Sequence, residues 1–174
     1  MSPADSADPT PLRLHYSAEL EELSLQTEMM GVVVDENLER MREVLTSGDV
    51  DLSTRAVAAD YRIDAMNVSL TERSYELLRR EAPVASDLRL IVSVLRVTSE
   101  LELIGDLALR VVKLAPDHDL LRSVPVAYDI LLTMADGAVD RYRQALRAWS
   151  TLDADLAAAV AAEGRQDFNA EVLV

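Results

Sequence analysis

The chain has 174 residues, a formal net charge of −14 and a hydrophobic fraction of 49%, which suits one domain, or two small repeats, with a sizeable core. An acidic chain without a basic patch is repelled by phosphate backbones, so we expect no nucleic-acid binding. Cysteine is absent, which excludes thiol catalysis, cysteine-ligated metals and disulfides and fits a cytoplasmic protein. Aromatic residues are only 4% of the chain, which favours long helices over a β-sandwich.

In chain order, the sequence predicts a disordered, proline-containing arm over residues 1–11, followed by long helices separated by short breaks. Apolar residues recur every three or four positions, which is helical spacing, and the breaks contain glycine or proline. Because long helices joined by short turns must lie antiparallel, we expect an all-α, elongated antiparallel helical bundle. The expected helices span residues 14–46, 52–80, 86–114 and 126–150, and a fifth begins near residue 153.

An internal repeat divides the chain. Residues 30–64 resemble residues 134–167 when one gap is allowed, which is the signature of a repeated structural unit. The first copy has three expected helices and the second has two. We therefore expect a complete first repeat over residues 12–116 and an incomplete second repeat over residues 117–174 that lacks its last helix. The apolar sides of the last two helices would then need covering by dimerisation or by a partner.

Two pairs of carboxylates are spaced four residues apart, so the members of each pair point the same way. Asp60 and Asp64 lie on the second expected helix, and Glu102 and Asp106 lie on the third. A projection at about 100° per residue places both pairs away from the long charged side chains, toward neighbouring helices. Gly105 removes a side chain beside the second pair, where a neighbouring helix or an ion can approach closely.

Buried like charges need compensation. The carboxylates could pair with arginines, could be protonated, or could hold a cation. Four carboxylates form an all-oxygen site that suits Mg²⁺, Mn²⁺ or Ca²⁺, and iron is a further candidate. The periodicity alone is equally compatible with a metal site and with a structural network of salt bridges.

Other side chains carry less chemistry. His15 and His118 have no glutamate three residues before them, so a ferritin-like di-iron centre is not favoured. We expect both histidines at the surface or at a helix cap. The tyrosines are expected in the core or at its boundary, and they stand at positions 16, 61, 75, 128 and 142.

The run PVASDLRLIVSVLRVTSELELIGDLA, residues 83–108, resembles the signature helix of the PhoU family, and AADYRIDAM, residues 58–66, is similar to the other acidic motif of that family. The resemblance covers about residues 14–174, closely in the first repeat and loosely in the second. It implies two three-helix repeats in a bundle that is commonly a homodimer. It also implies a regulator that restrains phosphate uptake and the phosphate-starvation response.

The resemblance further implies partners and metal ligands. The partners would be the ATPase of the phosphate transporter and a sensor histidine kinase, so membrane association would come only through them. The ligated ion would be iron, manganese, magnesium, calcium or zinc. The family usually has arginine where this chain has Leu103 and histidine where it has Leu107. The implied metal ligands are Asp60, Asp64, Glu102 and Asp106, with Glu163 and Asp167 as a weaker motif in the second repeat.

The resulting hypothesis is a non-enzymatic regulator of phosphate homeostasis, located in the cytoplasm, that acts negatively through protein contacts. One alternative is a metal-dependent enzyme acting on a phosphorylated substrate, which would need an open coordination position and a nearby acid or base. Another alternative is a purely structural dimerisation bundle in which arginines neutralise the carboxylates.

Overall fold

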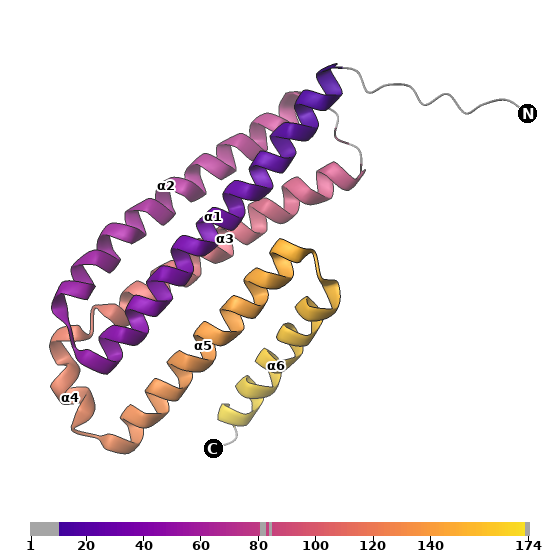
Figure 1. The fold of residues 1–174 in the computed structure, drawn as a ribbon. Helices are drawn as coiled ribbons and strands as arrows, with labels where there is room; N and C mark the ends of the chain where they lie inside the picture. Colours follow the sequence, from indigo (N-terminus) through magenta and orange to yellow (C-terminus); the bar gives the residue numbers. More distant parts are fainter. Residues whose placement is uncertain (1–10, 81–82, 84, 173–174) are drawn as a thin grey trace, which may run out of the picture.

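The computed structural model describes the backbone of residues 11–80, 83 and 85–172, and the side chains of residues 13–80, 83 and 85–164. Helices account for almost all of this backbone, which confirms the prediction of an elongated all-α bundle (Figure 1). The predicted arm lies outside the described residues except for Pro11, with which the first helix begins. The elements are α1 (Pro11–Ser47), α2 (Val50–Arg80), α3 (Ala85–Val112), the 3₁₀ turn η1 (Ala115–Asp117), α4 (His118–Arg122), α5 (Pro125–Thr151) and α6 (Ala154–Val172).

The helices α1, α2 and α3 form one unit in which each helix packs against the other two. Their apolar stripes meet in a shared core, because residues spaced by three, four and seven positions lie on one side of each helix. The side chains at the centre of this core have almost no solvent-accessible area. Its most deeply buried side chains include Leu23, Met30, Ile63, Leu70, Ile91 and Val94.

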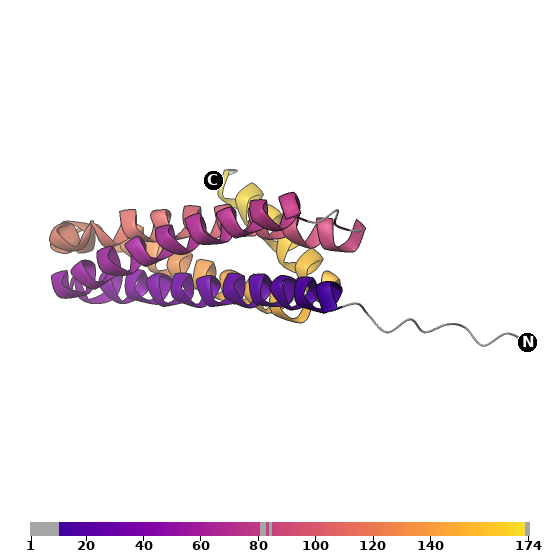
Figure 2. The same cartoon turned by 90° about the horizontal axis from the view of Figure 1, so that it is seen from above.

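The helices α5 and α6 are arranged differently. α5 packs along α1 on one side and against α6 on the other, and α6 crosses α5 obliquely (Figure 2). The described part of α6, residues 154–164, contains no buried residue. The second unit therefore has a much thinner core than the first.

The interface between α1 and α5 combines a close backbone approach with polar anchors. The Tyr142 hydroxyl is buried and donates a hydrogen bond of 2.6 Å to the carbonyl oxygen of Gly31. One residue further along α5, the Arg143 guanidinium donates to Asp35 at 2.8 Å and also contacts Glu39. A Cβ atom on Gly31 would lie 2.5 Å from a methyl group of Leu146, so glycine is what allows this approach.

The chain turns between the two units through a compact junction. The break expected between the helices at residues 86–114 and 126–150 contains η1 and the short helix α4. His118 was expected at the surface or at a helix cap; it is the C-cap residue of η1 and is buried, with 8% of its area exposed. Its Nε2 atom lies 3.1 Å from the carbonyl oxygen of Leu45, which also accepts a hydrogen bond of 2.7 Å from the Tyr128 hydroxyl. Gly48 adopts a φ of +71° beside the His118 ring.

Candidate functional site: an acidic seam and an apolar groove

The close contact between α2 and α3 is made by Ile63 and Gly105. Ile63 is fully buried, and a Cβ atom on Gly105 would lie only 3.1 Å from the Ile63 Cδ1 atom. The prediction that a neighbouring helix approaches closely at Gly105 is thereby confirmed.

The four candidate carboxylates lie beside this contact, along the line where α2 and α3 meet. We call Asp60, Asp64, Glu102 and Asp106 the acidic seam. The exposed Asp64 contradicts the expected orientation toward neighbouring helices, and the other three carboxylates face the neighbouring helix but are only partly buried. The physical reason is that Ile63 and Gly105 occupy the centre of the contact, so the carboxylates are placed at its solvent-facing edge.

The electrostatics of the seam centre on Asp60. Partial burial raises the pKa of Asp60, and the negative charges of Asp64, Asp106 and Glu102 raise it further, while Lys113 acts in the opposite direction. A carboxylate whose pKa is raised in this way is less stable in its charged form than an isolated one.

The seam has few polar partners within the described part of the chain. Asn67 donates a hydrogen bond of 2.9 Å to Glu102. Arg110 approaches Asp106 at 4.0 Å, which is the limit for an ion pair, and 70% of the Arg110 side chain and 47% of the Asp106 side chain are exposed. Pairing with this exposed arginine offsets little of the negative charge of the seam, since exposed ion pairs contribute at most about 1 kcal/mol to stability.

The donor chemistry of the seam suits a hard cation, because every candidate ligand is a carboxylate. In the residues for which side chains are described, no group of three or more His, Asp or Glu side chains converges closely enough to hold a metal ion. Glu163 is exposed on α6, and the Asp167 side chain lies outside the described residues. The metal-ligand assignment therefore stays a prediction.

A second feature is a groove between α3, α5 and α6, with a volume of about 560 Å³. The groove is open to solvent, and charged side chains such as Arg96, Glu100 and Asp153 contribute to its lining. The expected uncovered apolar side of the last two helices corresponds to this groove. Most of its lining is apolar, including Val97, Leu101 and Ile104 of α3, Leu146 and Trp149 of α5, and Ala157 and Val160 of α6.

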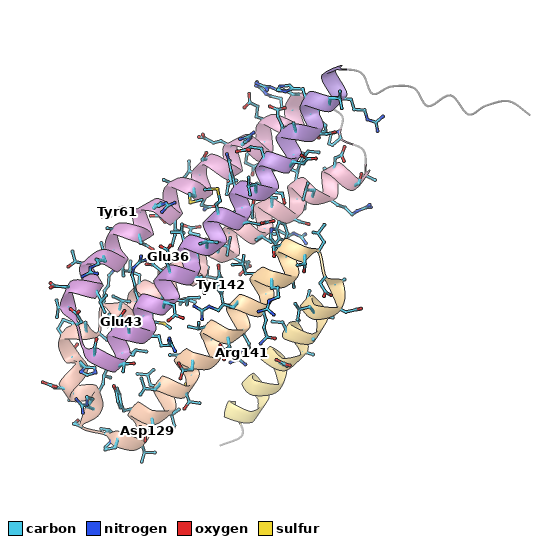
Figure 3. All side chains as sticks on the ribbon, in the orientation of Figure 1. Glu36, Glu43, Tyr61, Asp129, Arg141 and Tyr142 are labelled. Atoms are coloured by element: carbon cyan, nitrogen blue, oxygen red, sulfur yellow. The ribbon has the colours of Figure 1, made fainter. Side chains whose placement is uncertain are left out.

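The tyrosines divide into two groups. Tyr16 and Tyr142 are buried and Tyr128 is partly buried, as the sequence predicted. Tyr61 and Tyr75 are exposed by 72% and 60%, which contradicts the prediction of a core or boundary position. Figure 3 shows Tyr61 on the outer edge of α2 and Tyr142 on the part of α5 that faces α1.

Comparison with known proteins identifies the family. The PhoU domain matches residues 27–115, which is half of the chain. The chain belongs to the PhoU family. Its fold is similar to the crystal structure of PhoU from Pseudomonas aeruginosa, with a TM-score of 0.80 and 30% sequence identity over 87% of this chain and 72% of that chain.

Two sequence relatives support the same assignment. The chain is 28% identical to the phosphate-specific transport system accessory protein PhoU of Serratia marcescens, over 87% of this chain and 62% of that protein. It is 32% identical to the PhoU homolog of Pseudomonas putida, over 84% of this chain and 57% of that protein. The chain thus spans roughly three fifths of the length of these relatives, whose names denote accessory proteins of a phosphate-specific transport system.

The region that matches the PhoU domain contains the acidic seam but only part of the groove. All four carboxylates of the acidic seam lie within residues 27–115, whereas α5 and α6, which form much of the groove, lie beyond them. In the part of the chain that the structure describes, no helix is both long enough and apolar enough to cross a bilayer.

Proposed function

We propose that this PhoU protein is a non-enzymatic accessory regulator of phosphate-specific transport that works in the cytoplasm through protein contacts. The names of its relatives and its similarity to a PhoU crystal structure support this role. The observation that carries the contact mechanism is the open apolar groove, because a large apolar surface on a folded chain marks an interaction site.

The proposed partners are the ATPase of the phosphate transporter and the sensor histidine kinase, and the proposed action is negative when phosphate is plentiful. The groove would receive an apolar element of such a partner. Electrostatic attraction between the acidic surface of this chain and basic partner residues would favour the encounter.

The first test is recovery of partners by a tagged chain from native cells grown in high and in low phosphate. We expect the transporter ATPase or the kinase to be recovered in a phosphate-dependent way. Ala157→Glu places a charge in the groove, and its matched control is Ala158→Glu on the adjacent exposed position of α6. Loss of recovery for the first variant alone supports the groove. Recovery of neither partner, in cells that express both, overturns the regulatory proposal.

A further part of the proposal is that the acidic seam binds a divalent cation. The all-oxygen donor set and the raised pKa of Asp60 support it, because a cation would offset the repulsion between α2 and α3. The bound ion would supply positive charge at the seam, and the carboxylates would have to move closer together to hold it.

Metal content tests this part directly. The purified chain is incubated with Mn²⁺ or Fe²⁺, desalted and analysed for bound metal. We expect Asp60→Asn combined with Glu102→Gln to lower the bound metal, whereas Asp51→Asn, at an exposed position on the same helix, leaves it unchanged. Equal metal content in all three proteins would overturn the ligand assignment and favour the structural alternative.

A further inference from the structure

The internal repeat places an equivalent turn after the first long helix of each unit. When residues 30–64 are aligned with residues 134–167, Gly48 between α1 and α2 corresponds to Leu152 between α5 and α6. Both residues adopt the left-handed backbone conformation, with φ angles of +71° and +53°. The two turns therefore share a left-handed residue and differ in its side chain.

Leucine is an unfavourable residue for this conformation. A Cβ atom crowds the backbone when φ is positive, so glycine is the usual residue just after the end of a helix. Within the described backbone, Leu152 is the one residue other than glycine with a positive φ. The second repeat thus holds a strained leucine where the first repeat has glycine, and strain of this kind is concentrated at functional sites.

Packing within the fold does not offset this strain. Leu152 has 81% of its area accessible, the largest fraction among the exposed large apolar residues of the described chain, so its side chain gains little from folding. Gly48, in contrast, lies against His118, where an added Cβ would be 2.6 Å from Nδ1. Figure 1 shows α4 beside the turn between α1 and α2 and far from the turn between α5 and α6. The chain itself covers the first turn, whereas the second faces solvent.

Leu152 stands between two hollows in the surface. One is the groove between α3, α5 and α6. The other, which we call the side hollow, has a volume of about 350 Å³ and is lined by residues of α1, α3 and α5, including Leu20 and Leu90. Leu152 and the partly buried Trp149 line both hollows. A molecule that encloses Leu152 would therefore contact apolar surface on both sides of it, which is the arrangement of a central apolar anchor in an interface.

The charges around Leu152 indicate which kind of molecule fits. Within the described part of the chain, the three glutamates that line the hollows form no ion pair with a basic side chain. Such a rim attracts lysine and arginine, and it repels both an anionic bilayer and the acidic surface of a second copy. The charged residues that line the two hollows are Arg96, which is basic, and Glu21, Glu28, Glu100 and Asp153, which are acidic.

We propose that Leu152 anchors a docking site at the turn between α5 and α6, and that a partner protein receives it in an apolar recess bordered by lysine or arginine residues. This inference rests on the proposed function, because the partner is the transporter ATPase or the sensor kinase named there. It adds the side chain on which the contact depends, and it extends the contact from the groove across the turn to the side hollow.

Residues that suit the left-handed conformation separate docking from folding. Leu152→Gly and Leu152→Asn should keep the melting temperature or raise it by up to about 4 °C, because they relieve the strain. Both should weaken binding to the purified ATPase or kinase, whichever the tagged chain recovers, by at least about tenfold. Leu152→Met keeps an apolar side chain and should retain most of the affinity. Weaker binding together with a lowered melting temperature would indicate a structural role and overturn the proposal.

The matched control removes another exposed leucine. Leu120 on α4 has 70% of its area accessible and lies outside both hollows. Leu120→Asn should leave the affinity unchanged. An equal loss of affinity for Leu120→Asn and Leu152→Asn would mean that exposed apolar area in general, and not the turn, determines binding.

A charge reversal tests the basic border of the recess. Glu21→Lys should weaken binding several-fold, chiefly by slowing association, and the affinity of the unaltered chain should fall as salt is added. Glu43→Lys is the control, since Glu43 is an exposed glutamate on the same helix, about 33 Å away at 1.5 Å per residue. Unchanged or tighter binding by Glu21→Lys would contradict a partner with basic residues around its recess.

The single tryptophan of the chain reports where the partner binds. Because Trp149 lines both hollows, a chain labelled with 5-fluorotryptophan gives one fluorine signal from this site. We expect the signal to shift when the unlabelled partner is added, and to shift much less at the same concentrations in the Leu152→Asn variant. A signal that stays in place in a saturated complex would overturn this location.

The outcomes distinguish this inference from the proposed function. Binding that Leu152→Asn leaves intact would overturn the docking site and leave the regulatory function standing. Absence of binding to both partners would overturn the regulatory function, and this inference with it. Leu152-dependent binding to phosphatidylglycerol vesicles, or Leu152-dependent dimerisation, without effect on partner binding, would assign the turn to a lipid surface or to a second copy and overturn the proposed partner.

Discussion

The unit formed by α1, α2 and α3 differs from the pair α5 and α6 in how much apolar surface it buries. In the first unit each helix has two neighbours, so three stripes close over a common core. In the second, α6 rests on α5 and leaves a groove open beside α3. The difference shows that two packed helices of this kind do not bury their apolar stripes completely. A third element must cover the remaining side before these side chains are shielded from solvent.

The largest expected effect comes from the core of the first unit. Ile63→Ala should lower the free energy of unfolding by roughly 2–4 kcal/mol, because it removes buried methyl groups and leaves a cavity. Leu156→Ala, at a partly exposed site on α6, should cost less than about 1 kcal/mol. Urea denaturation followed by circular dichroism measures both losses, and equal losses would remove the contrast between the units.

The next largest change in stability is expected at one of the two glycines that differ most in their surroundings. Gly48→Ala should destabilise the fold by roughly 1–3 kcal/mol, because Gly48 has a φ of +71° and the added Cβ would lie 2.6 Å from the His118 ring. Gly164→Ala in α6 has nothing within 4 Å and should stabilise the helix by up to about 1 kcal/mol. Thermal melting compares the two. A destabilising Gly164→Ala would mean that α6 is more tightly packed than described.

A smaller loss of stability is expected when the hydrogen bond between α5 and α1 is removed. Tyr142→Phe removes the hydrogen bond to the Gly31 carbonyl and should cost about 1 kcal/mol. Burial and the nearby Asp35 raise the pKa of Tyr142 well above its usual value, so the hydroxyl stays protonated and the cost should be the same at pH 6 and pH 9. Tyr61→Phe, at an exposed site, is the control, and chemical denaturation at both pH values is the measurement.

The smallest effect concerns the acidic seam. The pKa of Asp60 is raised in the folded chain, so folding favours its protonated form and this carboxylate lowers stability as pH rises through its folded pKa. Without added metal, Asp60→Asn should therefore stabilise the fold at pH 7 by no more than about 0.5 kcal/mol. The gain should disappear below the ordinary pKa range of aspartate. Melting curves at pH 7 and pH 3 measure it, and a loss of stability at pH 7 would show that the charged form is favoured.

Local sequence patterns were sufficient to predict the long helices, because each apolar stripe ends at a clear break such as the turn at Gly48. The close approach at Gly105 was predictable for a similar reason, since only a missing side chain permits it. The helices and their breaks depend on residues that are near one another in the chain, and the close approach depends on one missing side chain.

Features that depend on how helices cross were not predictable in the same way. A helical projection shows which side of α2 carries Asp60 and Asp64, but not that Ile63 takes the centre of the contact with α3. Apolar residues at positions 61, 68 and 75 form a second seven-residue repeat in α2, which hides the exposure of Tyr61 because both faces of the helix look apolar. His118 is buried because the chain folds back at α4, far along the sequence from its contact at Leu45.

The neighbouring residues Tyr142 and Arg143 fix the register of the two units. They bond to Gly31 and Asp35, which stand one helical turn apart on α1. Sliding α5 along α1 by one turn, about 5.4 Å, would break both bonds at once and would press Leu146 against a residue with a side chain in place of Gly31. These two bonds therefore oppose translation of α5 along α1.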